Sequence, residues 1–105
     1  ETFRAGLSAD EYDRFLYATG RPNRITVESV MGESQAEWVG LQPGDHIMRY
    51  AGEPMHAWSD LRRASTDGEA GALVPIQVER EGRIVELSIE RGPLGVRLGS
   101  ESVKP

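Results

Sequence analysis

Histidine, serine and aspartate lie close together at His56, Ser59 and Asp60, and these residue types form the catalytic triads of hydrolases. Their spacing argues against that chemistry, because neighbours at the start of one helix do not point at one another and no nucleophile-elbow motif is present. A second pair, Asp45 and His46, is adjacent where a turn enters a strand, so the two side chains point in opposite directions. The sequence therefore predicts no catalytic residue and no enzymatic activity in this fragment.

Metal and cofactor chemistry has equally little support. The chain has two histidines and no cysteine, which leaves no thiolate site and no disulfide framework. It also lacks the His-Glu-x-x-His pattern, in which one helix presents two histidines to a zinc ion. We expect neither a metal nor a cofactor.

The charge balance argues against another class of function. Seventeen acidic and 12 basic residues give a net charge of −5, and no basic stripe interrupts it. Such a surface repels phosphate backbones and anionic lipids, so we expect no nucleic-acid partner. No stretch approaches the length of apolar sequence that crosses a bilayer, so we expect no direct membrane insertion by this fragment.

The chain has 105 residues, which suits one domain with a single core. Its first residue is Glu1 rather than methionine, and no signal peptide is recognisable, so we expect a trimmed part of a longer protein. Any export signal or membrane anchor would then be encoded elsewhere. As an isolated domain, the chain is expected to be monomeric.

Local patterns predict an α+β domain of about five strands with two or three short helices. Ser8 and Glu11 form a capping-box pattern that opens a helix over residues 9–19. A second such pattern begins at Ser34, and another helix is predicted over residues 58–65. Apolar alternation and compact apolar runs indicate strands at residues 24–30, 47–51, 73–80, 84–90 and 94–98.

The last of these strands has an unusual entrance. Arg91 and Gly92 precede it, and its approach is built from Pro93, Leu94 and Gly95. One interpretation is an ordinary closing strand after a turn. The other is that the segment forms an edge that binds a second chain.

Residues 36–55, AEWVGLQPGDHIMRYAGEPM, carry a more specific motif. A short helix leads into Gly40 and Leu41, then Pro43, Gly44 and Asp45, followed by a strand and a glycine turn. In this order the segment resembles a PDZ domain, and the resemblance extends over residues 24–98. It implies a small, partly open β-barrel to which the helix over residues 9–19 is an extra N-terminal element.

The Leu-Gly-Val signature at residues 94–96 lies at the C-terminal end, which is similar to the bacterial, circularly permuted PDZ type. That type occurs in HtrA-type and site-2-type proteases and in type II secretion components. The resemblance implies that a peptide adds as a strand between residues 94–98 and the helix over residues 58–65. The implied peptide-binding residues are Arg91, Pro93, Leu94, Gly95, Val96, Arg97 and Leu98 on one side and Trp58, Arg62 and Ser65 on the other.

The resemblance also implies a role for several of these residues. The backbone N–H groups of residues 94–96 would bind a terminal carboxylate, with Gly95 leaving room for its approach and Arg91 steering it. Arg62 would favour acidic ligand residues, and the apolar side chains of residues 94–98 would favour an apolar ligand C-terminus. Two alternatives stay open: Trp58 as a core or lid residue, and Arg62 as part of a solvated helix face.

We therefore divide the chain into an N-terminal helical extension at residues 1–23, a PDZ domain at 24–98 and a polar tail at 99–105. The expected function is to bind a partner's C-terminus or extended loop, and so to regulate or target a larger protein of the bacterial periplasm or cell envelope. The alternatives are a structural or assembly domain with an occluded groove, or the regulatory domain of an envelope protease. The N-terminal helix either packs on the domain or covers the groove.

Overall fold

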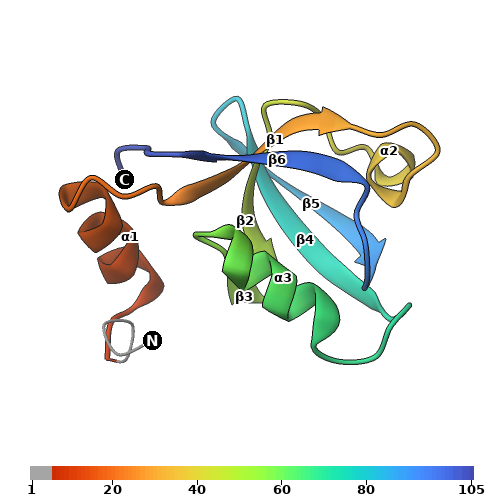
Figure 1. Ribbon diagram of the computed structural model, residues 1–105, viewed down its shortest axis with the longest axis horizontal. Helices are drawn as coiled ribbons and strands as arrows, with labels where there is room; N and C mark the ends of the chain where they lie inside the picture. Colours follow the sequence, from red (N-terminus) through yellow and green to blue (C-terminus); the bar gives the residue numbers. More distant parts are fainter. Residues whose placement is uncertain (1–5) are drawn as a thin grey trace.

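The computed structural model describes residues 6–105. This part of the chain forms one antiparallel sheet in the order β5-β4-β2-β1-β6, with a short β3 paired to β2. Helix α3 lies beside the sheet and β6 runs past it, which confirms the predicted α+β fold (Figure 1). The elements are α1 (Ala9–Ala18), β1 (Arg24–Val30), α2 (Gln35–Val39), β2 (His46–Tyr50), β3 (Glu53–Pro54), α3 (Trp58–Thr66), β4 (Leu73–Arg80), β5 (Arg83–Glu90) and β6 (Val96–Glu101).

Helices α1 and α2 begin where their capping residues predict. The Ser8 hydroxyl accepts a hydrogen bond from the N–H of Glu11, and the Glu11 carboxylate accepts one from the N–H of Ser8. These bonds lower the pKa of Glu11. The Ser34 hydroxyl caps α2 by accepting from the N–H of Glu37, and Gly40 ends the helix with a left-handed φ of 95°, a conformation that glycine adopts without strain.

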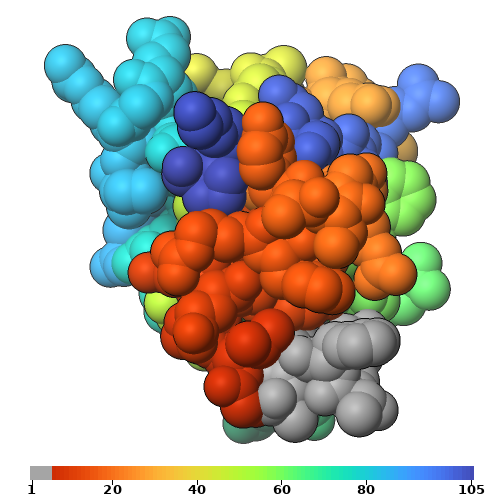
Figure 2. Space-filling view, turned by 90° about the vertical axis from the view of Figure 1, so that its left-hand side faces the viewer, coloured from red at the N-terminus to blue at the C-terminus, as the bar shows by residue number. Residues whose placement is uncertain are grey.

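A buried polar cluster fastens α1 to the sheet. The Asp13 carboxylate pairs with the guanidinium of Arg24 at the start of β1. The Asn23 amide donates to Asp13 at 2.9 Å and to the carbonyl of Val103 at 2.7 Å. In Figure 2 the red-orange N-terminal helix lies over one end of the molecule, with the dark-blue C-terminal segment beside it. Helix α1 is thus held against β1 and the C-terminal segment.

The loop over residues 40–45 is closed by its own hydrogen bonds. Asp45 is 1% exposed, and its carboxylate accepts from the N–H of Gln42 at 2.9 Å, as its place in the motif predicts. The same carboxylate takes two bonds of 2.8 Å from Arg80, and this pairing raises the pKa of the arginine. The N–H of Gly44 donates to Val27 of β1 at 2.7 Å, which ties the loop to the sheet.

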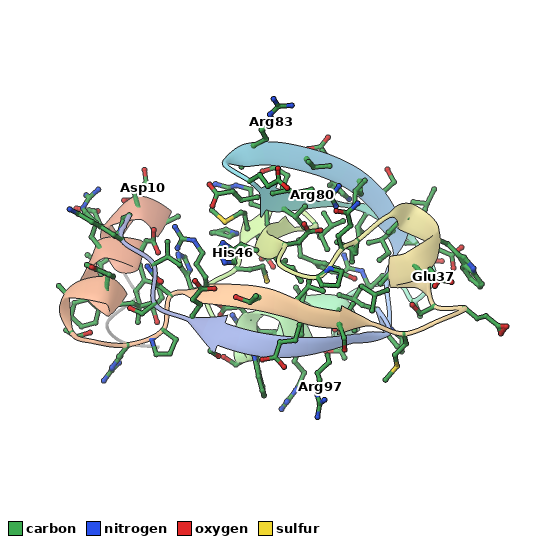
Figure 3. The ribbon with its side chains drawn as sticks, turned by 90° about the horizontal axis from the view of Figure 1, so that it is seen from above. Asp10, Glu37, His46, Arg80, Arg83 and Arg97 are labelled. Atoms are coloured by element: carbon green, nitrogen blue, oxygen red, sulfur yellow. The ribbon has the colours of Figure 1, made fainter. Side chains whose placement is uncertain are left out.

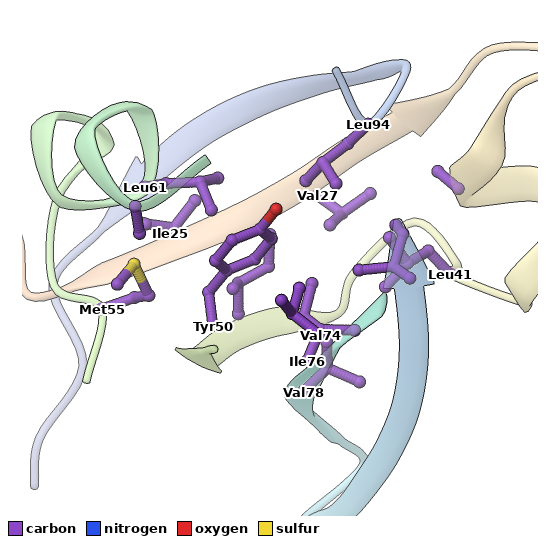
Figure 4. Close-up of a cluster of buried hydrophobic side chains, with 14 residues drawn as sticks. Ile25, Val27, Leu41, Tyr50, Met55, Leu61, Val74, Ile76, Val78 and Leu94 are labelled. Carbon is purple, nitrogen blue, oxygen red and sulfur yellow. The ribbon is translucent and has the colours of Figure 1, made fainter. Parts of the chain in front are cut away.

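One apolar core fills the space between the sheet, α3 and the loop before β6 (Figure 4). Fully burying a large apolar side chain contributes roughly 1.5–3 kcal/mol, so this core is the main source of stability. Its members with no exposed surface are Ala36 of α2 and seven residues from four neighbouring strands: Ile25, Val27, Ile47, Tyr50, Ile76, Val78 and Ile89.

One strand boundary differs from the prediction, and one helix begins where it was predicted. Strand β6 continues through Glu101, so that residues 99–101, assigned to a polar tail, lie in the sheet beside β1. Polar residues do not end an edge strand, because one of its faces is open to solvent. Helix α3 includes Trp58, with Ala57 as its N-cap residue. Alanine has no side-chain acceptor, but the Asp60 carboxylate supplies the reciprocal half of a capping box, since it accepts from the N–H groups of His56 and Ala57.

Candidate functional site

A groove of about 450 Å³ separates α3 from the segment that leads into β6. Nine of the ten residues that the sequence indicates line it, and Arg91 does not. Leu61 and Gly92 also line it, although the sequence interpretation omitted them. The predicted residues along the groove are Trp58, Arg62, Ser65, Pro93, Leu94, Gly95, Val96, Arg97 and Leu98.

Strand β6 presents an open edge to this groove. In the described residues β6 pairs with β1 alone, and the carbonyl of Gly95 accepts a bond of 2.9 Å from Met31, on the β1 side. The carbonyl of Glu101, six residues further on, again accepts from that side. Because backbone groups alternate in direction along a strand, Val96 and Leu98 present N–H and C=O toward the opposite, unpaired side.

The loop before β6 is held by its carbonyl groups. Leu94 accepts from the N–H of Ala36 in α2 at 3.0 Å, and Gly95 accepts from Met31. The N–H groups of Leu94 and Gly95 donate no hydrogen bond to any residue in the described part of the chain. The loop therefore offers two adjacent donors at the end of the groove.

Glycine is required at position 95 for a reason that the sequence interpretation missed. We expected it to leave room for a ligand. In addition, its φ of +81° excludes most side chains, and an added Cβ would lie 2.3 Å from the Cβ of Ser34. The glycine therefore allows the loop to pack against the N-terminus of α2.

Arg91 has a different place from the one expected. Its guanidinium donates to the carbonyls of Ala64 and Asp67 at the C-terminal end of α3, and it lies 6.0 Å from the centre of the Tyr50 ring. These contacts turn it away from the groove. The reason is the open C-terminus of the helix, where unpaired carbonyls attract a cation. Arg91 thus joins one wall of the groove to the start of the other.

Helix α3 forms the second wall with residues of different character. The Trp58 side chain is half-exposed, and its indole N–H donates to the carbonyl of Gly99 at 3.3 Å. It is therefore a wall residue that reaches across to β6 rather than a core residue. Leu61 is buried at the base, and Arg62 is exposed. The Ser65 hydroxyl donates to the Arg62 carbonyl of its own helix.

Tyr50 lies beneath the groove with an unsatisfied hydroxyl. The residue has no exposed surface, and its hydroxyl has no hydrogen-bond partner in the described residues. Figure 4 shows the hydroxyl pointing to the side of the core where Leu61 and Leu94 lie. Burial raises the pKa of Tyr50, while the backbone of Gly92 and the charge of Arg91 act in the opposite direction. No sequence pattern distinguished this tyrosine from an ordinary core residue.

Other sites expected or excluded from the sequence can be placed as well. No residue of α1 lines the groove, so within residues 6–105 the helix leaves it open. His56 contacts the ring of Tyr12 in α1, and Asp60 caps α3, so these two side chains serve packing and capping. The described residues contain no cluster of three or more potential metal ligands, and no helix among them is long and apolar enough to span a bilayer.

Known proteins resemble this chain over most of its length. The sequence model of the PDZ domain family matches residues 6–90. A protein of Brucella suis named "Putative zinc metalloprotease" is 34% identical over 86 residues, which cover 74% of this chain and 22% of the relative. The probable periplasmic serine endoprotease DegP-like of Hahella chejuensis is 32% identical over 74 residues, covering 70% of this chain and 16% of the relative.

A third relative and one solved structure extend the comparison. The magnetosome formation protease MamE of Magnetospirillum gryphiswaldense is 31% identical over 72 residues, 69% of this chain and 9% of its own length. The chain thus spans less than a quarter of each of these relatives. The HtrA-type protease AlgW, solved with a decapeptide, matches 90% of this chain and 36% of its own with a TM-score of 0.50 and 17% identity, which shows a shared fold.

The family assignment joins these comparisons to the geometry. The family match includes the 40–45 motif and the strands around it, and the structure places a groove between α3 and the edge strand β6. The chain itself is a non-catalytic module, and its relatives are named as proteases. This chain belongs to the PDZ domain family.

Proposed function

We propose that this domain binds the C-terminus or an extended loop of a partner protein as an added strand between α3 and β6. An extended peptide that enters the groove would pair with the N–H and C=O groups of Val96 and Leu98. Its terminal carboxylate would accept from the N–H groups of Leu94 and Gly95. The backbone bonds would fix the register, and side-chain contacts would select the sequence.

The observation that carries this proposal is the coincidence of three features at one place. Two unpaired N–H donors, an open strand edge and an apolar groove meet between residues 94–98 and α3. Donors without partners cost free energy where water is excluded, and an anion at that position offsets the cost. The carbonyls of the same two residues are already bonded to Ala36 and Met31, so an anionic acceptor suits the site better than a donor.

The groove also indicates which terminal side chain would fit. Leu61 and Leu94 are buried at its base, and Val96 and Leu98 are partly buried beside them. We expect an apolar terminal residue, and an affinity on the order of micromolar, because a short flexible peptide loses conformational freedom when it binds.

A backbone NMR titration with short peptides that end in valine or leucine tests the proposal. Each peptide is used as a free acid and as an amide. Shifts of residues 58–65 and 94–98 with the acid alone support carboxylate recognition. Equal shifts with both forms support recognition of an extended loop. A folded sample with no shifts at these residues contradicts the proposal and favours a structural domain with an occluded groove.

The relatives favour a further assignment at the level of the whole protein. Three of them are named as proteases, and one of these is described as periplasmic. We propose that the domain regulates or targets a protease of the bacterial cell envelope. In the full-length protein, a groove-binding peptide should change the rate of proteolysis of a substrate that lacks that sequence. An unchanged rate, with peptide binding demonstrated, contradicts the regulatory role.

A further inference from the structure

The two sides of the groove each carry one cationic side chain. Arg62 extends from α3 and Arg97 from β6, and both line the groove with exposed side chains. Neither guanidinium forms a hydrogen bond or ion pair with any described residue. By contrast, Arg24 and Arg80 are paired with Asp13 and Asp45.

The groove lining differs in charge from the chain as a whole. The chain as a whole carries a charge of −5, yet none of the described residues that line the groove is acidic. The groove is thus a cationic site on an anionic domain. A ligand with carboxylates at the matching positions gains attraction there, whereas the rest of the surface repels it.

The strand geometry assigns each arginine to a different ligand position. Val96 and Leu98 pack toward the core, and Arg97 between them is exposed on the other face, extending away from the sheet in Figure 3. Directly opposite residues of antiparallel strands share a face. A ligand whose last residue lies opposite Val96 therefore places its penultimate side chain beside Arg97.

The third residue from the ligand's end points back toward α3. The indole of Trp58 reaches Gly99, and Arg91 fixes the other end of α3 beside the loop, so α3 runs antiparallel to β6. Arg62 is one helical turn from Trp58, roughly 6 Å along the axis. Two strand residues span about the same distance, so the backbone of Arg62 lies about level with Arg97. Helical side chains tilt toward the N-terminus of their helix, so the Arg62 side chain extends from there toward the level of Leu98, opposite the third residue from the ligand's end.

We propose that the groove selects peptides with an apolar C-terminal residue and a carboxylate at one or both of the two preceding positions. Arg62 recognises the third residue from the end, and Arg97 recognises the penultimate one. The stronger contribution comes from Arg62, because the side chain of Glu28 lies over Gly99, on the face of β6 that also carries Arg97, and weakens the field of that arginine. This inference rests on the proposed function.

The test compares four peptides that end in valine and differ only in the two preceding residues. These are glutamine at both positions, glutamate at either one, and glutamate at both. Fluorescence or calorimetry gives Kd for the wild-type domain. Exposed ion pairs predict that each glutamate tightens binding by about 1.5- to 5-fold. The advantage should vanish near 1 M salt, where the screening length is about 3 Å.

Charge-neutral variants assign the contributions. Arg62→Gln should remove the advantage of glutamate at the third position only, and Arg97→Gln that at the penultimate position only. Arg83→Gln is the matched control, because Arg83 lies on the opposite side of the molecule in Figure 3 and outside the groove. Both glutamate effects should persist in it.

The outcomes separate this inference from the proposed function. If the all-glutamine peptide binds as a free acid and glutamate gives no advantage, the acidic preference is wrong and the peptide-receptor function stands. An advantage that survives both groove variants also overturns the assignment. If none of the four peptides binds a folded domain, both the inference and the proposed function fail.

Discussion

Two loops of this domain contain the same kinds of residue and have opposite properties. The loop over residues 40–45 and the loop over residues 92–95 are both built from glycine, proline and leucine. In the first, Asp45 and Arg80 join the backbone in closed hydrogen bonding. In the second, the carbonyls of Leu94 and Gly95 accept hydrogen bonds, while their N–H groups have no acceptor among the described residues. Satisfied polar groups build the fold, and unsatisfied ones leave a place for a ligand.

The largest effect is expected from breaking the closed loop. Asp45→Asn removes a buried charge that two Arg80 nitrogens and the N–H of Gln42 contact. Because Arg80 is partly exposed and can regain water, we expect a loss of about 2–3 kcal/mol in the free energy of unfolding.

Urea denaturation measures this loss, with exposed Glu69→Gln as a control that should stay within about 0.5 kcal/mol of the wild type. The folded fraction of Asp45→Asn should keep its peptide affinity. A large fall in affinity with unchanged stability would show that the two loops are not separable in this way.

The open loop should respond differently to a change in its glycine. Gly95→Ala imposes a strained φ and a clash with Ser34, so we expect a loss of about 1–3 kcal/mol together with weakened peptide binding. Ser34→Gly removes the clash but not the strained φ. The double variant should therefore recover part of the lost stability beyond the sum of the single effects, as a double-mutant cycle in urea would show. Strict additivity would contradict the packing explanation for this glycine.

Arg91 tests whether the open loop depends on its link to α3. Arg91→Met removes the bonds to the carbonyls of Ala64 and Asp67, and we expect a loss of about 1–2 kcal/mol. Peptide affinity should fall more than for the surface control Arg83→Met, since the two walls of the groove are no longer joined. Calorimetric titration of both variants, at a temperature where each is folded, measures the two peptide affinities. Equal affinities would indicate that the walls are positioned without Arg91.

The smallest expected effect on stability concerns Glu101, the last residue of β6. Hydrogen bonds from His46 and Thr26 lower the pKa of Glu101. A lowered carboxyl pKa stabilises the fold above the ordinary titration range of glutamate, and this contribution is lost as the pH falls through the lowered value.

Because the Glu101 carboxylate is half-exposed, its contribution should be no more than about 0.5 kcal/mol. Unfolding free energies measured from pH 6 down to pH 3 should therefore decline slightly less steeply for Glu101→Gln than for the wild type. Peptide affinity should not differ between the two proteins at neutral pH. A change in affinity would connect this end of the strand to the groove.

Much of this structure follows from local sequence signals. The Ser8 and Ser34 caps, the Gly40 stop and the alternating strands depend on neighbours within a few residues, so the pattern alone predicts them. The groove residues could be named because the resemblance supplies the pairing of α3 with β6. The caps and strands were predictable because the residues that determine them are close in sequence, and the groove residues because the family resemblance implies them.

The features that local patterns did not indicate depend on contacts between residues far apart in the sequence. Arg91 bonds to carbonyls more than 20 positions away, and the clash that requires Gly95 comes from Ser34. The extension of β6 through residues 99–101 depends on pairing with β1, which local polarity does not indicate. A single sequence carries no direct signal of such contacts.

The open edge of β6 has a further consequence for how this protein behaves at high concentration. An unpaired strand is a template for the same strand of another molecule, and such pairing begins aggregation. Two copies joined edge to edge about Arg97 would place two guanidinium groups opposite each other, which like charges disfavour. Helix α3 lies across the groove from that edge, so it also restricts the approach of a second sheet. The features that would admit a peptide thus discourage the domain from polymerising with itself.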